Sequence, residues 1–533
     1  MNIYFVGMCV AMTTLVCVGI WISRKIQGAE DFYVAKRQAP VLLIAGSLIA
    51  SYTSTGMFMG DASMFYDGAF SPMILLEGMQ SAGYIIGAVF LGRYLRRSNE
   101  LTIPAFFGFR FQSPKVRIMA AVVAIITMLV YSLSVLQGIG TLMTAVTSVN
   151  YNFCIILSMI VVTIIAVASG SRGVLITDTI MASLFTVAIM ASALFISNCA
   201  GGWYSSVSSV TQVSGDLLSW GGKIGSGGEP GPLGYFSEID NVIWGFINGI
   251  VWMSVCMTGP WQSSRYLMAK DEGTVLRAGF IAAIGVFLLE FLTGMAAVMV
   301  NSVNPNISPT SNVLIWASMN ILPLFLGVIL LTGILSAGLS SVTTFISLIG
   351  ASVANDILEL KEEKSIAAGR VAMIVAGVVV LGAAIVNSPS IFWIMFLGGS
   401  VVACSWMPVA LASVFWKNLT RTGAFYGMLA GFIGCFAIRL VSTLGDISLP
   451  IYLEPNLVGI TLNIIVMTVA SLLTNVSADE IEAKKALLVI PETERKPETL
   501  KQTLTYAKRS IWIGVVVFLI LALLWVIPYW QAK

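Results

Sequence analysis

A cluster of hydroxyl side chains inside one apolar stretch is the first feature of this sequence that could do chemistry. The segment SAGLSSVTTF, residues 336–345, carries five Ser and Thr residues within a run that is otherwise apolar enough to lie in lipid. On a helix, residues three and four positions apart share a face, so Ser340 and Ser341 lie on the same side as Thr344. Hydroxyl and carbonyl oxygens suit a hard cation such as sodium. The alternative is that these hydroxyls bond to carbonyls of their own helix.

The stretch IAGSLIASYTSTGMFMGDASMFYDG, residues 44–68, is the second such feature. Its glycines and hydroxyl residues make it a poor continuous helix, although its apolar content requires it to span a membrane. Interrupted membrane helices expose carbonyls that line ion and substrate sites. A matching break is predicted in WMSVCMTGPWQ at Gly259 and Pro260, because proline cannot continue the hydrogen-bond ladder.

Three acids are expected inside or at the edge of membrane helices: Glu77, Asp178 and Glu290. An ionised acid at the centre of such a helix costs about 2.5 to 3.5 kcal/mol on insertion scales, so each calls for a partner, a proton or a cation. For Asp178 the alternatives are a helix cap near the membrane edge or a partner of Arg172. No central Arg or Lys is expected in any span.

The elements that must position these residues are membrane helices, as the composition indicates. Hydrophobic residues make up 57% of 533 and charged residues 10%, against about 25% charged residues in an ordinary soluble domain. The net charge of +3 does not indicate a nucleic-acid partner. The absence of histidine excludes histidine-based metal sites, Ser-His nucleophiles and histidine proton relays. Seven single cysteines show no metal-binding spacing, and we expect no enzyme.

Fourteen apolar stretches are each near the roughly 20 residues that cross a bilayer as a helix. The predicted spans are 3–23, 41–65, 69–92, 118–145, 152–170, 174–199, 238–262, 275–301, 312–348, 368–387, 390–416, 422–443, 455–474 and 510–529. Alternate loops then hold every Lys and Arg except Lys223, Arg439 and Lys533 on one side. By the positive-inside rule that side is cytoplasmic, which places both termini outside a multi-pass protein of the cell membrane.

The predicted architecture is therefore an all-α integral membrane protein with about 14 transmembrane helices. The two broken spans are second and seventh, five apart, which predicts a five-plus-five inverted repeat with two discontinuous helices. The predicted regions are an N-terminal helix and cytoplasmic loop (1–40), a first repeat of spans two to six (41–199), a Gly/Ser-rich external loop (200–237), a second repeat of spans seven to eleven (238–416), and three C-terminal helices (417–533) with a charged cytoplasmic linker (475–509).

Six motifs in order resemble the sodium:solute symporter family, which includes sodium/glucose, sodium/proline and sodium/pantothenate carriers of the LeuT-type fold. The motifs are AEDFYVAKRQAP, SLIASYTST, TIPAFFGFRF, GSRGVLITDTIM, PWQSSRYLMAKD and AGLSSVTTFISLIGASVANDI. They run through most of the first twelve spans. PWQSSRYLMAKD departs from the commoner patterns of the family at several letters.

The resemblance implies sodium between the second and ninth spans and, in some members, a further sodium on an acid of the sixth span. The first site then comprises carbonyls of Ala50, Thr53 and Ala337 with hydroxyls of Ser340 and Ser341. The second comprises Asp178 with Ser340, Thr343 and Thr344. Candidate substrate contacts near the membrane midplane are Ser54, Thr55, Met57, Glu77, Gln137, Asn248, Trp252 and Trp261.

For these candidates the alternatives are an interfacial or packing role for the tryptophans and helix-to-helix hydrogen bonds for Gln137 and Asn248. The expected partners are sodium, a small-molecule solute and the lipid bilayer. The expected function is sodium-coupled import by alternating access, with a monocarboxylate or other small organic acid as the first guess. Sugars, amino acids and vitamins are the alternatives, and a transporter-like membrane sensor is the rival class.

Overall fold

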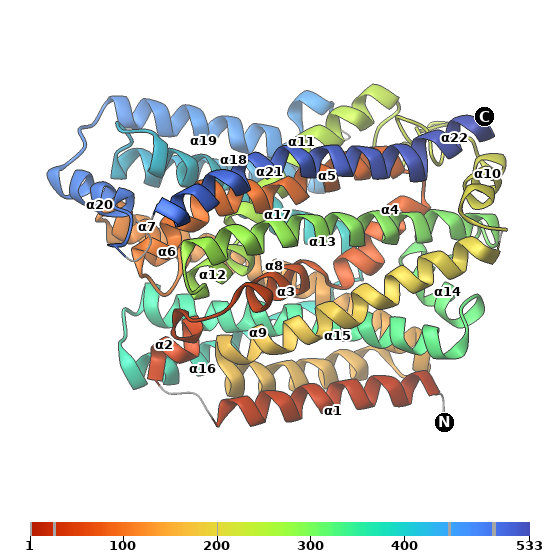
Figure 1. The fold of residues 1–533 in the computed structure, drawn as a ribbon, viewed down its shortest axis with the longest axis horizontal. Coiled ribbons are helices and arrows are strands. Elements are labelled where there is room, and N and C mark those ends of the chain that lie inside the picture. The colour runs from red at the N-terminus through yellow and green to blue at the C-terminus, as the bar shows by residue number, and fades with distance from the viewer. Residues whose placement is uncertain (1–2, 25–27, 200, 446–448, 493–496) are drawn as a thin grey trace.

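The chain forms a bundle of helices that run largely side by side (Figure 1). The computed structural model describes residues 1–533 except 1–2, 25–27, 200, 446–448 and 493–496. Within the described part the secondary structure is almost entirely helical, apart from two isolated β-bridges. The all-α architecture predicted from composition is confirmed.

The longer helices are α1 (Ile3–Ser23), α3 (Val41–Tyr52), α5 (Phe70–Gly87), α8 (Pro114–Thr147), α9 (Tyr151–Cys199), α11 (Glu238–Thr258), α13 (Glu272–Met299), α15 (Leu324–Ala351), α16 (Glu362–Val386), α17 (Ile391–Phe415), α18 (Arg421–Gly445), α19 (Pro455–Leu472) and α21 (Pro497–Leu521). The shorter helices are α2 (Gly28–Val34), α4 (Ala62–Tyr66), α6 (Arg93–Ser98), α7 (Ile103–Phe111), α10 (Trp203–Val213), α12 (Pro260–Met268), α14 (Val313–Asn320), α20 (Ala478–Leu488) and α22 (Ile527–Ala532). Four π-helical segments are η2 (Gly56–Asp61), η3 (Ala88–Gly92), η6 (Ser352–Ile357) and η9 (Ala522–Val526). The 3₁₀ turns are η1 (Ala35–Arg37), η4 (Val300–Ser302), η5 (Thr310–Asn312) and η7 (Ile451–Leu453).

The expected count of fourteen spans is not confirmed. Within the described residues, twelve helices are long and apolar enough to cross a membrane, or thirteen when the bent second span is counted. The first helix adds a shorter apolar stretch, Ile3–Val18. The long run of α9 contains two of the twelve, Tyr151–Ala168 and Gly173–Cys199, where the sequence predicted separate fifth and sixth spans.

Three predicted boundaries differ from the structure. The ninth span was expected to begin at residue 312, but α14 ends before Pro323 and the spanning helix α15 begins at Leu324. Proline has no N–H for the helical ladder, which explains the interruption. The seventh span continues past its predicted end at residue 262 to Met268, and the third continues to Ser98.

Both predicted helix breaks are present. The second span is bent by 46° between Val41–Tyr52 and Gly56–Tyr66. The seventh is interrupted at Gly259, whose ψ of 135° separates α11 from α12. A Cβ at Gly56 would lie 2.2 Å from the sulfur of Met395 on α17, so a larger residue there would require the Met395 side chain to move. The broken segment therefore packs directly against the eleventh predicted span.

The two ends of the bundle differ in what covers them. Both termini lie at the end that also carries α10 and α14, whereas α20 lies at the opposite end with α6, α7 and α2 (Figure 1). The predicted external loop 200–237 contains the helix α10, and the predicted cytoplasmic linker contains α20, whose first turn is closed by a capping box between Ser477 and Glu480.

The helix α20 is docked onto the bundle. Arg97 of α6 forms an ion pair with Glu272 and donates to the Leu487 carbonyl at 3.0 Å, and Arg110 of α7 donates to the Glu480 carbonyl at 3.3 Å. Burial lowers the pKa of Arg110 to about 10, so its guanidinium stays charged at neutral pH. These contacts hold part of the predicted linker in a fixed place.

Candidate cation and solute site

The hydroxyl cluster of α15 lies against the break in the second span, as predicted. The Ser341 hydroxyl donates to the Thr53 carbonyl at 3.3 Å. Thr53 caps α3 with an extended backbone (φ −65°, ψ 118°), and this conformation leaves its carbonyl outside the helical ladder. Ala50 and Ala337, the other two residues expected to offer carbonyls, are fully buried. Two of the five predicted oxygens of the first sodium site are thus in direct contact.

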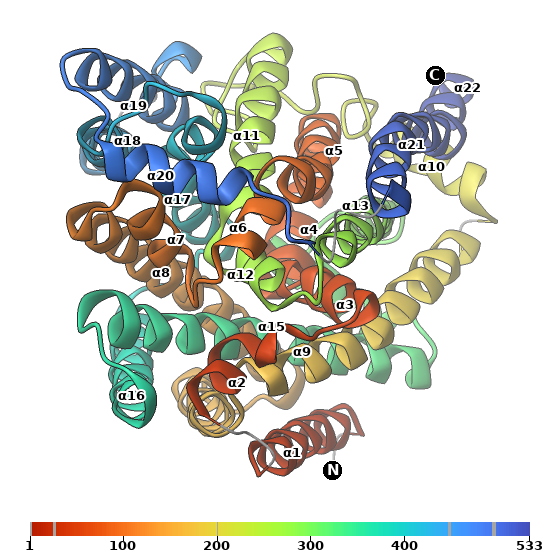
Figure 2. The ribbon, with the colours of Figure 1, turned by 60° about the vertical axis from the view of Figure 1, so that its left-hand side comes forward.

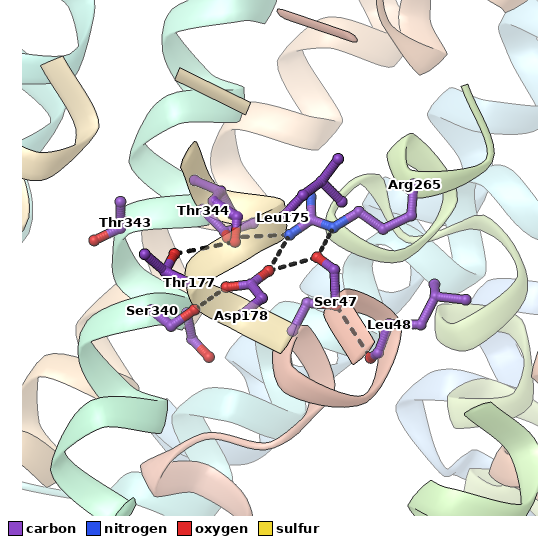
Figure 3. A network of polar contacts seen from close by, with 12 residues as sticks. Ser47, Leu48, Leu175, Thr177, Asp178, Arg265, Ser340, Thr343 and Thr344 are labelled. Atoms are coloured by element: carbon purple, nitrogen blue, oxygen red, sulfur yellow. Dashed lines mark hydrogen bonds and ion pairs between the residues drawn. The ribbon is translucent and has the colours of Figure 1, made fainter. Parts of the chain in front are cut away.

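The carboxylate of Asp178, on α9, is held by three neighbouring elements (Figure 3). Ser340 of α15 donates to Oδ1, and Ser47 of α3 donates to Oδ2 at 2.5 Å. The Arg265 guanidinium, from α12, donates to the same Oδ2 at 3.1 Å. A buried carboxylate with an ion pair and two hydroxyl donors is a satisfied group.

Arg265 is the residue of this network that the sequence analysis missed. It was counted as a cytoplasmic loop residue, and no central Arg or Lys was expected, but its side chain is 2% exposed. It also donates to the Ser47 hydroxyl at 2.8 Å and to the Thr344 hydroxyl at 3.2 Å. The expectation failed because an arginine near a helix end resembles an interfacial anchor, and only the tertiary packing of α3 and α9 buries it. No sequence signal marked it, because the segment 260–268 is rich in polar residues.

Thr343 shows features of both roles considered for the α15 hydroxyls, a cation ligand and a hydrogen bond within its own helix. Its hydroxyl donates to the Leu339 carbonyl of its own helix at 2.7 Å, which is the ordinary role of a threonine in a membrane helix. It also lines a cavity of about 10 Å³ next to Asp178 and Ser340, with Thr177 and five apolar residues completing the wall. That volume suits one water-sized occupant.

A second group of acids lies elsewhere in the core. Asp61 of η2, Glu77 of α5 and Glu290 of α13 bring carboxylate oxygens within 4.8 Å of one another, and all three side chains are buried. We call these residues the acid triad. Asp61 was not counted among the membrane acids, although it lies inside the predicted span 41–65, so a simple census of that span would have found it.

The acid triad has donors on one side only. Glu77 Oε2 accepts hydrogen bonds from the Tyr52 hydroxyl at 3.3 Å and from Gln80 Nε2 at 2.5 Å. Both oxygens of Glu290 are buried without a hydrogen-bond partner among the described residues. Two like charges about 5 Å apart repel by roughly 3 kcal/mol at an effective dielectric constant of about 20, so the ionised triad needs a positive charge.

A connected set of aromatic rings begins next to the acid triad, at Tyr52. Tyr52 packs edge-on against Trp252 with ring centroids 6.5 Å apart, and Trp252 in turn contacts Tyr131 at 6.4 Å. Tyr131 also packs against Trp261 at 5.1 Å. Both tryptophans are buried, and the indole N–H of Trp252 has no partner among the described residues. The structure thus brings three of the predicted substrate contacts, Glu77, Trp252 and Trp261, into one connected region.

The remaining predicted substrate contacts are buried and occupied by protein. Gln137 donates to the carbonyls of Asn387 and Ser388, both at 3.3 Å, and accepts from the Ser390 amide. Asn248 accepts from Asn456 at 2.7 Å, a helix-to-helix bond to α19.

The last three candidates belong to the broken span itself. Thr55 donates to the Val135 carbonyl of α8 at 2.9 Å, and Ser54 accepts from the Gly56 amide within the break. Met57 is buried beside them. The bond of Asn248 to α19 matches the alternative of a helix-to-helix hydrogen bond, whereas Gln137 bonds to the loop between α16 and α17. Ser54 stabilises the break.

The family follows from a comparison with protein-family models. The model described as the sodium:solute symporter family matches residues 32–431. The chain belongs to the sodium:solute symporter family. This is a family of sodium-coupled transporters and not of enzymes, and with the membrane-length helices it makes the chain a multi-pass membrane protein.

Curated members of the sodium:solute symporter family give the same result. The chain is 22% identical to a sodium/proline symporter of Salmonella typhimurium over 457 residues, which cover 80% of this chain and 86% of that protein. It is equally similar, over 458 residues, to a sodium/proline symporter of Escherichia coli. Identity at this level leaves the solute open.

Solved structures confirm the fold of this family member. A Na⁺-coupled sialic acid symporter in a substrate-bound outward-open state superposes with a TM-score of 0.73 at 16% identity, covering 90% of this chain and 99% of that one. Mhp1, a nucleobase-cation-symport-1 family transporter in a closed conformation, superposes with a TM-score of 0.56 at 11% identity over 85% of this chain. Both are transporters of the LeuT-type fold, as the sequence resemblance implied.

Proposed function

We propose that this protein is a sodium-coupled symporter that imports a small organic solute by alternating access. The observation that carries the proposal is the contact between the Ser341 hydroxyl of α15 and the Thr53 carbonyl at the break of the second span. Free carbonyls at a helix break, faced by hydroxyls from another helix, form the oxygen-rich environment that a sodium ion needs.

The first sodium site in this proposal uses the carbonyls of Ala50, Thr53 and Ala337 and the hydroxyls of Ser340 and Ser341. An ion shared between α3 and α15 favours the conformation in which these two helices are together, because it binds that state more tightly than a separated one. Coupling follows if solute binding at the same break favours the same state.

A second sodium on Asp178, with Ser340, Thr343 and Thr344, stays a prediction. The cavity of about 10 Å³ beside Asp178 favours it. The ion pair with Arg265 counts against it, since the guanidinium already neutralises the carboxylate and accounts for its burial. The sodium-to-solute ratio distinguishes the two roles.

For the solute, we infer an amino compound in preference to the monocarboxylate that the sequence first suggested. The comparisons do not support a monocarboxylate, and three buried carboxylates in the core would repel one. An amino group would be attracted to the same carboxylates. The sodium/proline relatives also carry an amino compound, according to their names. Sugars and vitamins are the remaining alternatives.

The test is uptake into proteoliposomes that contain the purified full-length protein. Labelled amino acids, amines, sugars, monocarboxylates and vitamins are offered with an inward sodium gradient, with equal sodium on both sides, and with potassium in its place. The proposal expects accumulation of at least one amino compound only under the sodium gradient. Binding without accumulation of any solute would instead favour the sensor alternative.

A further inference from the structure

We propose that the acid triad of Asp61, Glu77 and Glu290 is a binding site for a primary ammonium group, so that the transported solute is a cationic amine. This inference rests on the proposed transport function and narrows its substrate class. The three carboxylates come from different elements, η2, α5 and α13, so the fold and not a local sequence run assembles them.

The first argument is the surplus of acceptors at the triad. Among the described residues, both oxygens of Glu290 are fully buried without a hydrogen-bond partner by geometry, and so is Oε1 of Gln80, whose amide nitrogen is bound to Glu77. The Tyr52 hydroxyl lies close to Glu290 but donates to Glu77. Thr293, one turn from Glu290 on α13, also has a buried hydroxyl without a partner. Among the ion pairs of the described residues, none reaches the three acids. Unsatisfied buried acceptors of this kind are expensive unless a donor with positive charge occupies the site.

The second argument is size. No two of the three carboxylate oxygens are more than 4.8 Å apart, so a donor between them can lie about 2.8 Å from each, the length of a charged N⁺–H···O⁻ hydrogen bond. A metal ion with shorter bonds is the rival occupant, and the calcium chloride arm of the experiment below tests it. The three N–H groups of a primary ammonium can each point to one carboxylate.

The third argument is the aromatic wall next to the triad. Tyr52, which donates to Glu77, packs against Trp252, and Trp252 contacts the ring of Phe396 at 5.4 Å. Aromatic faces favour organic cations with an apolar body, whereas small metal ions prefer water and oxygen ligands. Charge and apolar surface therefore meet at one place, as an amine with a carbon skeleton requires.

The total charge adds a constraint on the ligand. Three ionised acids carry more negative charge than one ammonium group can neutralise. For a neutral site, the triad binds either a monoamine together with two protons held by the carboxylates, or a diamine whose second ammonium group lies nearby together with one proton. The two cases differ in their pH dependence, because the first requires one more proton.

The experiment uses four probes with the same four-carbon chain and different charge: butylamine, diaminobutane, butanol and butyrate. Purified full-length protein in lipid nanodiscs, at fixed sodium, is heated with each probe, and the melting temperature is recorded. Both amines, or diaminobutane alone, should raise the melting temperature in a saturable manner, whereas butanol and butyrate should not. Equal shifts with butanol, or a shift with calcium chloride and none with the amines, would overturn the proposal.

Substitutions in the acid triad test whether the amine binds there. In Glu290→Gln and in Asp61→Asn the amine should bind at least about tenfold more weakly, because a buried charged contact is lost. Glu272→Gln is the matched control, since it is the same substitution on the same helix in an ion pair with Arg97, far along α13. If the affinity for the amine is unchanged in both triad variants, the acid triad is not the amine-binding site.

Measuring sodium-dependent uptake together with amine binding distinguishes a failure of this inference from a failure of the proposed function. Sodium-dependent uptake of a neutral or anionic solute, together with no amine binding, would leave the symporter proposal intact and refute the triad. Amine binding without any sodium-dependent uptake would support the triad and refute the symporter proposal. Uptake of a neutral solute with proton movement, lost in Glu290→Gln, would make the triad a proton site and refute the ammonium assignment.

Discussion

The acids of this protein lie in two environments that differ in one respect. Asp178 is surrounded by donors, with Arg265, Ser47 and Ser340 all directed at its carboxylate. In the acid triad, Glu290 accepts no hydrogen bond by geometry within the described residues, and the nearby Tyr52 hydroxyl donates to Glu77 instead. A carboxylate that the protein itself neutralises has a structural or positioning role, whereas one left without a donor is available to a cation from outside. From this contrast we infer that the triad binds a ligand and that Asp178 has mainly a structural or positioning role.

The largest effect is expected when Arg265, the ion-pair partner of Asp178, is removed. Arg265→Ala should destabilise the protein by about 3 to 5 kcal/mol, because it leaves a buried carboxylate uncompensated. Combining it with Asp178→Ala should restore much of the loss, and thermal unfolding of the four proteins of this cycle measures the coupling. A double variant as unstable as the sum of the singles would show that the pair does not interact.

The hydroxyls of α15 should be essential for the response to sodium. Ser340→Ala combined with Ser341→Ala removes two of about five oxygens of the first sodium site, so sodium-driven uptake should be lost or require far more sodium. Ser347→Ala is the control on the same helix, since its buried hydroxyl has no partner among the described residues. An unchanged sodium dependence in the double variant would disprove the first site.

Asp178→Asn tests whether the compensated acid also binds an ion. If a second sodium is present, the variant should transport fewer sodium ions per solute, with a Hill coefficient falling from near two toward one. Each coupled ion contributes about 2.3 kcal/mol per 100 mV, so the reversal potential reports the ratio directly. If Asp178 serves only Arg265, stability falls and the ratio stays the same.

A smaller effect of opposite sign is expected at the triad. Without amine, Glu290→Gln should leave stability unchanged or raise it by about 1 to 3 kcal/mol, because it removes repulsion between buried carboxylates. Thermal unfolding in the absence of added ligand is the measurement. Comparable destabilisation in Glu290→Gln and Asp178→Asn would erase the distinction between the two sites.

Labelling tests which end of the bundle faces the cytoplasm without altering transport. Asp178 lies near the start of the stretch Gly173–Cys199, and Arg265 lies near the end of α12. Asp61 ends η2 and Glu77 lies within α5, on either side of the short helix α4, which is near the middle of the view in Figure 2. The basic-residue split predicts that the α20 end faces the cytoplasm.

In a cysteine-free background, Ser226→Cys should react with an external reagent in intact cells and Ala486→Cys should not. Both positions are exposed, whereas Gly225 has no room for a Cβ and Ala483 is buried against the bundle. The reverse labelling would invert the topology. Labelling at both positions would indicate a miscounted span.

Local features of the chain were readable from the sequence because short-range physics produces them. The apolar stretches, the glycine-rich break near Gly56 and the interruption at Gly259 follow from composition and backbone geometry. The contact of Ser341 with Thr53 followed from family resemblance combined with helical spacing. The count of spans was less accurate, because Pro323 and the weakly apolar ends of helices shift boundaries.

What the sequence by itself determined is a membrane bundle of this family with oxygen ligands at a helix break. Only the tertiary structure decided which buried charges have partners. Arg265 and Asp178 are 87 residues apart, and Asp61 and Glu290 lie on different halves of the chain. Electrostatic energy depends on distance and burial, neither of which a linear sequence contains, so the same residue type became a paired carboxylate at one site and an open one at the other.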